Sequence, residues 1–251
     1  MVQESSDNGI MDRLKQLAGQ RAVVTGASRG IGAAVAHRLA ALGAHVFLTA
    51  RDADRLRAVT EAIMATGGSA EAHAFDLAET AHIAEFAQTA LRSGTCNILV
   101  NNAGIGRFGG PLHTMDSDSF DRLMAVNLRA PYLLLRAFAP AMIAAGSGHI
   151  INISSLASRN PVPNGAAYAG AKAGLNGMMI SAAEELRQHQ VRVSLVEPGS
   201  VRTEFGAGLA DAKSPLGAIA AEDIAEIVAF LALQPPQCFV SEVLVRPTLK
   251  K

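Results

Sequence analysis

The chain has no excess of charge of either sign and very little cysteine. Lysine and arginine number 22 and aspartate and glutamate number 22, so the formal net charge of the 251 residues is +0, and no basic run occurs. Nucleic-acid binding needs a surplus of basic residues facing the phosphates, so we expect no nucleic-acid partner. The two cysteines, Cys96 and Cys238, lie far apart without metal-ligand spacing. We expect both to be free, buried packing residues, as in a reducing cytosol, and not a disulfide.

Long apolar runs and a secretory-type start are also missing. No uninterrupted apolar stretch approaches the roughly 20 residues that a membrane helix needs, so no membrane span is expected. Residues 1–8 are polar and acidic with no apolar segment behind them, which argues against a secretory signal and favours a cytoplasmic location. The seven histidines show no ligand spacing, so we expect no metal site.

What the sequence does contain is a regular alternation of short apolar runs and longer segments of helical period. Apolar residues make up 49% of the chain, which suits a sizeable core, and no linker divides it. We expect a flexible extension over residues 1–18 and a single domain over 19–251. The alternation predicts an α/β fold, with a doubly wound, seven-stranded parallel sheet and about three helices on each face. The expected strands cover 22–24, 45–48, 72–75, 98–100, 149–153, 191–196 and 243–245, and the expected helices 33–42, 54–65, 83–91, 120–145, 168–186 and 224–233.

Three glycines bracket the junction between the first expected strand and the first expected helix. They stand in the segment Thr25-Gly26-Ala27-Ser28-Arg29-Gly30-Ile31-Gly32. Glycine lets the backbone approach a pyrophosphate closely, and the free N–H groups and the dipole at a helix start bind the anion. The segment therefore predicts a dinucleotide site formed by Gly26, Ser28, Arg29, Gly30, Ile31 and Gly32.

The residue after the second expected strand indicates which dinucleotide is bound. Many NAD-binding folds place an acidic residue there, which binds the ribose 2′-hydroxyl, but this chain has Arg51. Together with Ser28 and Arg29, Arg51 suits a 2′-phosphate through charge-assisted contacts. We therefore expect NADP in preference to NAD, while the neighbouring Asp52 would favour the opposite choice. Residues after the third and fourth strands are expected to border the adenine and ribose: Asp76, Leu77, Asn102, Ala103 and Gly104.

Tyr168 and Lys172 are four residues apart, so one helical turn places both side chains on the same face. A nearby ammonium favours the phenolate, and we expect it to lower the pKa of Tyr168 from its ordinary value of about 10. Ser155 ends the fifth expected strand, where its hydroxyl can face the phenol across the crevice. Ser155 lacks a nucleophile elbow, which excludes a serine hydrolase.

Taken in order, these motifs resemble the short-chain dehydrogenase/reductase family in its common single-domain form, over residues 21–247. The resemblance implies a single-domain Rossmann fold and a catalytic set of Asn127, Ser155, Tyr168 and Lys172. The residues that carry it are Thr25-Gly26-x-x-x-Gly30-Ile31-Gly32, Asn101-Asn102-Ala103-Gly104, Asn127, Ser155, Tyr168-x-x-x-Lys172 and Pro198-Gly199 with Thr203. It also implies coenzyme contacts from Tyr168, Lys172, Pro198, Gly199, Val201 and Thr203.

The resemblance further implies a role for each catalytic residue. Tyr168 would exchange a proton with the substrate oxygen, Ser155 would polarise the carbonyl, and Lys172 would hold the nicotinamide ribose. Asn127 would anchor a water that relays protons to the lysine. Because asparagine is a poor helix former, its place inside an expected helix also predicts a local distortion or a bound water.

The substrate is expected to be a small carbonyl compound or alcohol that contacts Ser155, Leu156, Tyr168 and Phe205. The segment Thr203-Glu204-Phe205 and the chain ending are similar to those of NADP-dependent 3-hydroxy acid dehydrogenases. A 3-oxoacyl-[acyl-carrier-protein] reductase is the close alternative, and a redox sensor that binds the dinucleotide without turnover is an alternative of another class. Family members usually form dimers or tetramers, so the resemblance implies a homo-oligomer, either a dimer or a homotetramer. Further pocket candidates are Arg107, Phe108, Arg159, Arg202 and Leu216, whose arginines could meet a carboxylate or a phosphopantetheine.

Overall fold

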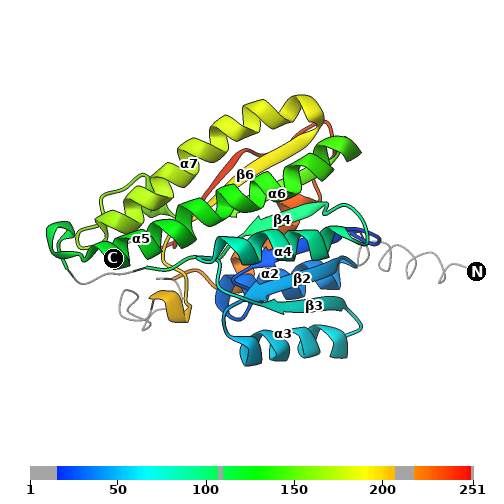
Figure 1. Ribbon diagram of the computed structural model, residues 1–251, viewed down its shortest axis with the longest axis horizontal. Helices are drawn as coiled ribbons and strands as arrows, with labels where there is room; N and C mark the ends of the chain where they lie inside the picture. The colour runs from blue at the N-terminus through cyan, green and yellow to red at the C-terminus, as the bar shows by residue number, and fades with distance from the viewer. Residues whose placement is uncertain (1–15, 107–109, 207–217, 250–251) are drawn as a thin grey trace, which may run out of the picture.

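The computed structural model describes residues 16–106, 110–206 and 218–249, and a seven-stranded parallel sheet forms its centre (Figure 1). The strand order is β3-β2-β1-β4-β5-β6-β7, so the order reverses between β1 and β4. Every neighbouring pair runs parallel, which confirms the doubly wound sheet. The strands are β1 (Arg21–Thr25), β2 (His45–Ala50), β3 (Ser69–Ala74), β4 (Ile98–Asn101), β5 (Gly148–Ile153), β6 (Val191–Pro198) and β7 (Glu242–Val245).

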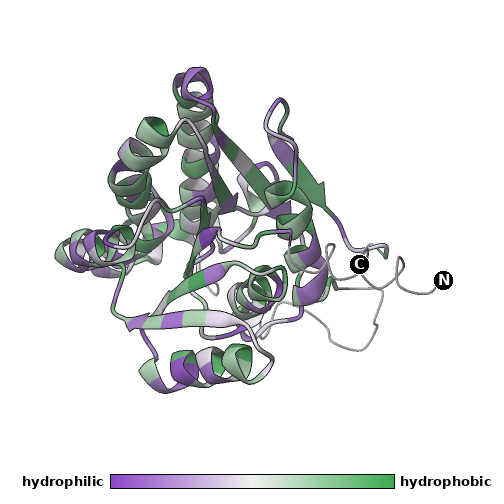
Figure 2. Cartoon of the chain, turned by 90° about the vertical axis from the view of Figure 1, so that its right-hand side faces the viewer, coloured by the Kyte–Doolittle hydropathy of each residue, from purple (hydrophilic) through white to green (hydrophobic). Residues whose placement is uncertain are grey.

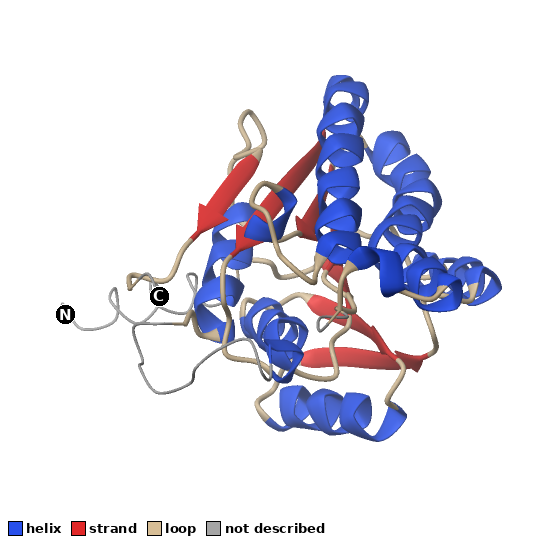
Figure 3. Cartoon of the chain, turned by 90° about the vertical axis from the view of Figure 1, so that its left-hand side faces the viewer, coloured by secondary structure: helices blue, strands red, loops and turns tan. Residues whose placement is uncertain are grey.

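Helices cover both faces of the sheet, as Figure 3 shows. The core cluster on one face includes side chains of α2 (Gly30–Ala41), α3 (Ala53–Ala65) and α8 (Ala221–Ala232). The cluster on the other face includes side chains of α4 (Thr80–Leu91), α6 (Ala130–Ala145) and α7 (Ala166–Leu186). Three helices on each face therefore confirm the expectation. Shorter helical segments are η1 (Leu112–Thr114), α5 (Ser117–Met124), η2 (Ala125–Arg129), η3 (Leu156–Ser158), η4 (Arg187–His189) and η5 (Glu204–Gly206).

The central strands are buried on both sides. In β1, Val23 belongs to one core cluster, whereas Ala22 and Val24 belong to the other. Successive side chains point to opposite faces of a strand, so a strand between two helical layers needs apolar residues at every position. Figure 2 shows these strands as mostly hydrophobic. The edge strand β3 is more exposed and carries the polar residues Ser69 and Glu71.

The expected helix over 120–145 is interrupted. The segment consists of α5, the π-helical turn η2 and α6. Asn127 lies inside η2, so the local distortion expected there is confirmed. Pro131, near the start of α6, has no N–H and cannot donate the usual helical bond to the carbonyl of Asn127 four residues earlier. This missing hydrogen bond is a local reason for the interruption of the α-helix at Asn127.

By length and composition alone, one helical run in the described residues could cross a membrane, namely 117–145, with a hydropathy of 1.2. This run includes the π-turn, and in the fold α6 packs against α4 while η2 packs against α7. Core helices of globular proteins meet the same criterion.

One smaller expectation needs correction. Cys96 is buried as expected, but Cys238 is exposed, because it lies in the turn that precedes the edge strand β7. Leu17, near the end of the expected extension, is only 1% exposed and docks on the core. Its N–H donates to the carbonyl of Leu42 at 2.8 Å, which ties this residue to the end of α2.

Candidate active site

A cavity of about 460 Å³ lies at the carboxyl ends of the strands, where the strand order reverses. This is where open α/β sheets bind their ligands. The structure brings most of the predicted site residues to its wall. These are Gly26, Ser28, Arg29, Gly30, Ile31, Arg51, Asp76, Leu77, Asn102, Ala103, Gly104, Ser155, Leu156, Tyr168, Lys172, Pro198, Gly199, Val201, Thr203 and Phe205.

The glycine-rich turn is packed too closely to accept side chains. Gly26 has a φ of +67°, which favours glycine, and a Cβ there would lie 2.8 Å from Cα of Ala103. Gly32 does not line the cavity, contrary to its predicted coenzyme contact. A Cβ on Gly32 would lie 2.3 Å from the carbonyl oxygen of Gly26, so this glycine packs behind the turn. Its contribution is the shape of the turn.

Asn102 fastens the end of β4 to the same turn. Its side-chain Nδ2 donates to the carbonyl of Thr25 at 2.9 Å, and its backbone N–H donates to Oγ1 of Thr25 at 3.0 Å. Asn102 lines the cavity, but its amide is engaged within the protein. The two strand ends on either side of the reversal point are therefore held together.

The basic residues at this end of the cavity have different partners. Arg29 is ion-paired with Glu204, and Arg55 donates to both carboxylate oxygens of Glu204 at 3.0 Å. These bonds, with that of Arg55 foremost, hold the pKa of Glu204 below its usual value. Within the described ranges, the Arg51 side chain forms no hydrogen bond or ion pair. Asp52 is the N-cap residue of α3, and its carboxylate accepts a hydrogen bond from the N–H of Arg55 at 3.0 Å.

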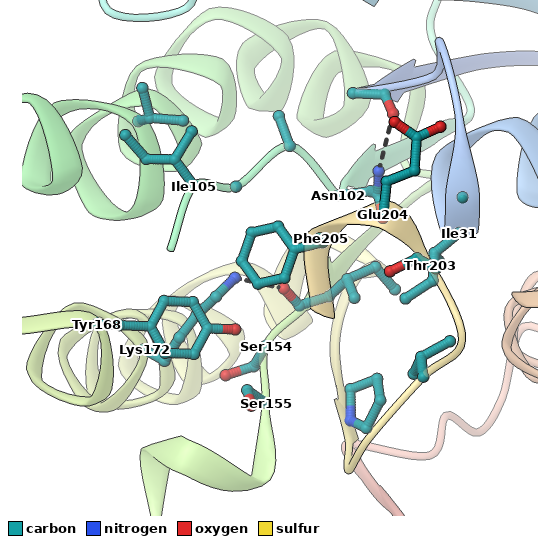
Figure 4. A pocket seen from close by; sticks show the side chains of 18 of the residues that line it. Ile31, Asn102, Ile105, Ser154, Ser155, Tyr168, Lys172, Thr203, Glu204 and Phe205 are labelled. Atoms are coloured by element: carbon teal, nitrogen blue, oxygen red, sulfur yellow. Dashed lines mark hydrogen bonds between the residues drawn. The ribbon is translucent and has the colours of Figure 1, made fainter. Parts of the chain in front are cut away.

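Tyr168, Lys172 and Ser155 point toward one space beneath Phe205 (Figure 4). Tyr168 is 7% exposed and Lys172 is 4% exposed. The Lys172 Nζ lies 5.9 Å from the centroid of the Tyr168 ring and donates to the carbonyl of Ile153 at 2.8 Å. Three groups suited to proton transfer therefore border one part of the cavity.

The expected lowering of the Tyr168 pKa is wrong for the protein alone. Burial of the phenol raises the pKa of Tyr168, and a hydrogen bond with Ser155 opposes this only in part. Burial also lowers the pKa of Lys172 to about 8, because the interior disfavours the ammonium. The sequence showed that both groups share a helix face but not that burial would dominate their titration.

Asn127 lies behind the cavity wall and does not line the cavity. Its side chain is fully buried, with Oδ1 accepting from the N–H of Ile105 at 2.8 Å and Nδ2 donating to the carbonyl of Ile105 at 2.7 Å. A Cβ on Gly104 would lie 3.3 Å from Oδ1 of Asn127 and 3.8 Å from Nζ of Lys172. Asn127 and Lys172 therefore flank the same glycine, and the Asn127 amide positions the segment after β4.

The substrate end of the cavity is mainly apolar in the described residues. Leu156 and Phe205 line it, and the rings of Phe205 and Tyr168 are 5.9 Å apart at an angle of 48°. Arg159 is not available to a substrate carboxylate, because it is paired with Glu197 and Glu242. Arg202 lies outside this cavity, and Arg107, Phe108 and Leu216 lie outside the described residues.

Several lining residues were not foreseen from the sequence. Ala50 and Phe75 immediately precede expected contacts at strand ends, so extending each expected contact by one residue would have found them. Val126 reaches the cavity from the π-turn, for which no local pattern gives the orientation. The residues missed are Ala50, Phe75, Ile105, Val126, Ile153, Ser154, Ala157, Asn160 and Ser200.

The histidines and acidic residues form no metal centre in the part of the chain that the structure describes, where no group of three or more His, Cys, Asp or Glu is suitably placed. His149 is buried on β5, and its Nε2 lies 2.8 Å from Oγ of Ser194. Burial lowers the pKa of His149 to about 3, so it is neutral and packs in the interior.

Comparisons with known proteins agree with this geometry. A family model described as short chain dehydrogenase matches residues 20–214. A metagenomic short-chain oxidoreductase, solved as a crystal structure in complex with NADP, is 63% identical, with a TM-score of 0.84 over 94% of this chain and 100% of that one.

Curated relatives add three further similarities. The trans-4-hydroxycyclohexanecarboxylate dehydrogenase of Sinomonas cyclohexanicum is 38% identical over 84% of this chain and 85% of its own length. The 3-oxoacyl-[acyl-carrier-protein] reductase of Escherichia coli is 36% identical over 85% of this chain and 90% of its own length. A short chain dehydrogenase of Pseudocercospora fijiensis is 41% identical over 76% of this chain, and the match spans 63% of its own length.

Proposed function

Because the chain belongs to the short-chain dehydrogenase family, we propose that it transfers hydride between NADP(H) and a carbonyl or secondary-alcohol substrate, with Tyr168 as general acid and base. The observation that carries the proposal is the joint placement of Tyr168, Ser155 and Lys172 at one end of a cavity whose other end is the glycine-rich turn. When bound, NADP(H) supplies or accepts the hydride.

The preference for NADP rests on the residues that would face the adenine ribose. Arg51 lines the cavity beside Asp76, with whose charge it interacts, and its guanidinium forms no hydrogen bond or ion pair in the described residues, so it can meet a 2′-phosphate. Asp52, which could have favoured NAD, is engaged at the start of α3. The relative that is 63% identical is described in complex with NADP. These observations together favour the phosphorylated coenzyme.

The phenol of Tyr168, whose pKa is raised by burial, is protonated at neutral pH, which is the form that carbonyl reduction requires. A phenol that is neutral at neutral pH can donate its proton to the substrate oxygen. Ser155, at the end of β5, would donate a hydrogen bond to the same oxygen as negative charge develops there. The nearby Lys172 ammonium would then stabilise the phenolate that the transfer leaves.

For the substrate we propose a 3-oxo or 3-hydroxy acid. The similarity to a hydroxycyclohexanecarboxylate dehydrogenase supports a substrate that carries both a hydroxyl and a carboxylate. Reduction of a 3-oxoacyl thioester is the alternative, supported by the 36% identity to an acyl-carrier-protein-dependent reductase. A dinucleotide sensor without turnover is the candidate of another class, but a sensor has no need of a buried proton donor.

We also propose a cytoplasmic location and assembly into a homo-oligomer, up to a tetramer. Both cysteines are free. Tyr132 on α6 and Ile180 on α7 are 44% and 43% exposed, so these long helices present apolar surface that a second copy could cover.

A coenzyme and substrate panel tests the proposal. NADPH and NADH are each combined with 3-oxo acids, 3-oxoacyl thioesters and simple ketones, and coenzyme oxidation is followed. We expect turnover with NADPH and a higher kcat/KM for the 3-oxo acids than for the thioesters. Coenzyme binding without turnover on any carbonyl would favour the sensor, and faster turnover of the thioesters would favour the alternative substrate.

A further inference from the structure

Glu197 is a fully buried carboxylate that the proposed chemistry does not use. It stands near the end of β6, directly before Pro198 and Gly199, which line the coenzyme cavity. Its two oxygens accept from Nε and Nη2 of Arg159, both at 2.8 Å. Oγ of Ser158 also lies 2.8 Å from Oε2 of Glu197. The carboxylate is therefore paired and hydrogen-bonded on both oxygens.

The partners of Glu197 belong to the segment that begins with Ser155. Oγ of Ser158 lies 2.6 Å from the carbonyl oxygen of Ser155, so its single proton can be donated to Ser155 or to Glu197. On the other side, Nδ2 of Asn176 on α7 donates to Oγ of Ser158 at 3.1 Å. Oδ1 of Asn176 accepts from Ser154 at 2.6 Å. The segment is therefore fastened to β6 by Glu197 and to α7 by Asn176.

A buried ion pair of this kind is weak evidence for a stabilising role. Removing a carboxylate from water is costly even when it is paired, and replacing a buried ion pair by well-packed apolar residues is often neutral or stabilising. Here two carboxylates, Glu197 and Glu242, share the one guanidinium of Arg159. Buried polar groups of this kind fix a particular geometry. The geometry that Glu197 fixes is the distance between the Ser155 segment and the residues that face the coenzyme.

We propose that Glu197 is a positioning residue. It acts through Arg159 and Ser158 to fix the position of the Ser155 hydroxyl relative to Pro198, Gly199 and the coenzyme. The inference rests on the proposed function, because it assigns Ser155 a contact with the substrate oxygen. A displacement of about 1 Å at a reacting group can cost up to about 100-fold in rate. Glu197 therefore affects the reaction without touching substrate or coenzyme.

A double-mutant cycle between Glu197 and Ser155 tests this role. Wild type, Glu197→Gln, Ser155→Ala and the double variant are saturated with NADPH, and the rate of coenzyme oxidation is measured in a single turnover with the best ketone of the panel. We expect Glu197→Gln to slow the step by about 10- to 100-fold in the wild-type background and to have no further effect beside Ser155→Ala. Equal slowing in both backgrounds, or no slowing in either, would overturn the proposal.

The matched control is Glu242→Gln, which removes the other carboxylate on Arg159 and leaves Ser158 untouched. We expect its rate to stay within about twofold of wild type; a loss as large as that of Glu197→Gln would overturn the proposal, because charge balance on Arg159 would then be the cause. Should Glu197→Gln fail to fold, Ser158→Ala replaces it in the same cycle with the same criteria. Absence of turnover in wild type would refute the proposed function itself, whereas an additive cycle in an active enzyme refutes only the role of Glu197.

Discussion

Replacing Lys172 by methionine should change stability in a way that depends on pH. Burial lowers the pKa of Lys172 from 10.5 to about 8. At 1.36 kcal/mol per pKa unit, keeping this ammonium buried costs roughly 3 kcal/mol below pH 8. The folded pKa is the lower one, so the cost is fully present below about pH 8 and disappears as the pH rises through 10.5. Methionine has a similar shape and carries no charge, so Lys172→Met removes the cost.

The variant also loses the hydrogen bond from Nζ to the carbonyl of Ile153, measured at 2.8 Å. An unpaired buried carbonyl costs about 1 to 3 kcal/mol, so the net gain at pH 7 is at most about 2 kcal/mol. This loss does not vary with pH, and it cancels when two pH values are compared.

Urea denaturation at pH 7 and pH 10.5, without coenzyme, measures the effect. Relative to wild type, we expect Lys172→Met to lose roughly 3 kcal/mol of stability between these pH values, while its turnover is abolished. If the difference between the two proteins is the same at both pH values, the lysine titrates normally and the argument from burial is wrong.

Further predictions concern the coenzyme end of the cavity and the assembly. Arg51→Ala should raise the dissociation constant of NADPH by about 10- to 100-fold and leave that of NADH nearly unchanged, measured by titration of coenzyme fluorescence. Gly32→Ala should destabilise the fold by about 1 to 3 kcal/mol in urea, because the new Cβ would lie 2.3 Å from the carbonyl of Gly26. Gly177→Ala in α7, where no atom lies within 4 Å of the added Cβ, should instead stabilise it by up to about 1 kcal/mol. Light scattering at micromolar concentration should give a mass of two or four chains; a mass of one chain, 26.1 kDa, would refute the homo-oligomer.

The fold was predictable because its signals are local and repeated. Buried parallel strands need apolar residues on both faces, and Ala22, Val23 and Val24 of β1 show this directly in the sequence. The glycine-rich turn was predictable for a related reason. Gly26 has positive φ and a backbone neighbour at 2.8 Å, and both requirements select glycine at that position.

The site was less predictable where its properties depend on surroundings distant in the chain. The spacing of Tyr168 and Lys172 gives their common face but not their burial, and burial reverses the expected pKa shift of the phenol. The sequence suggested that Arg159 could meet a substrate carboxylate, yet Glu197, 38 residues away, accepts hydrogen bonds from its Nε and Nη2. Which charged side chains form ion pairs depends on the fold and cannot be read from the local sequence.

The most direct test of the account is the single-turnover rate of NADPH oxidation by Tyr168→Phe in the presence of a carbonyl substrate. Tyr132→Phe is the matched control, since Tyr132 is the only other tyrosine and is 44% exposed on α6. We expect Tyr168→Phe to bind NADPH as wild type does and to lose about 100- to 10,000-fold in rate, while the control keeps the wild-type rate. A rate for Tyr168→Phe that approaches wild type would show that another group donates the proton.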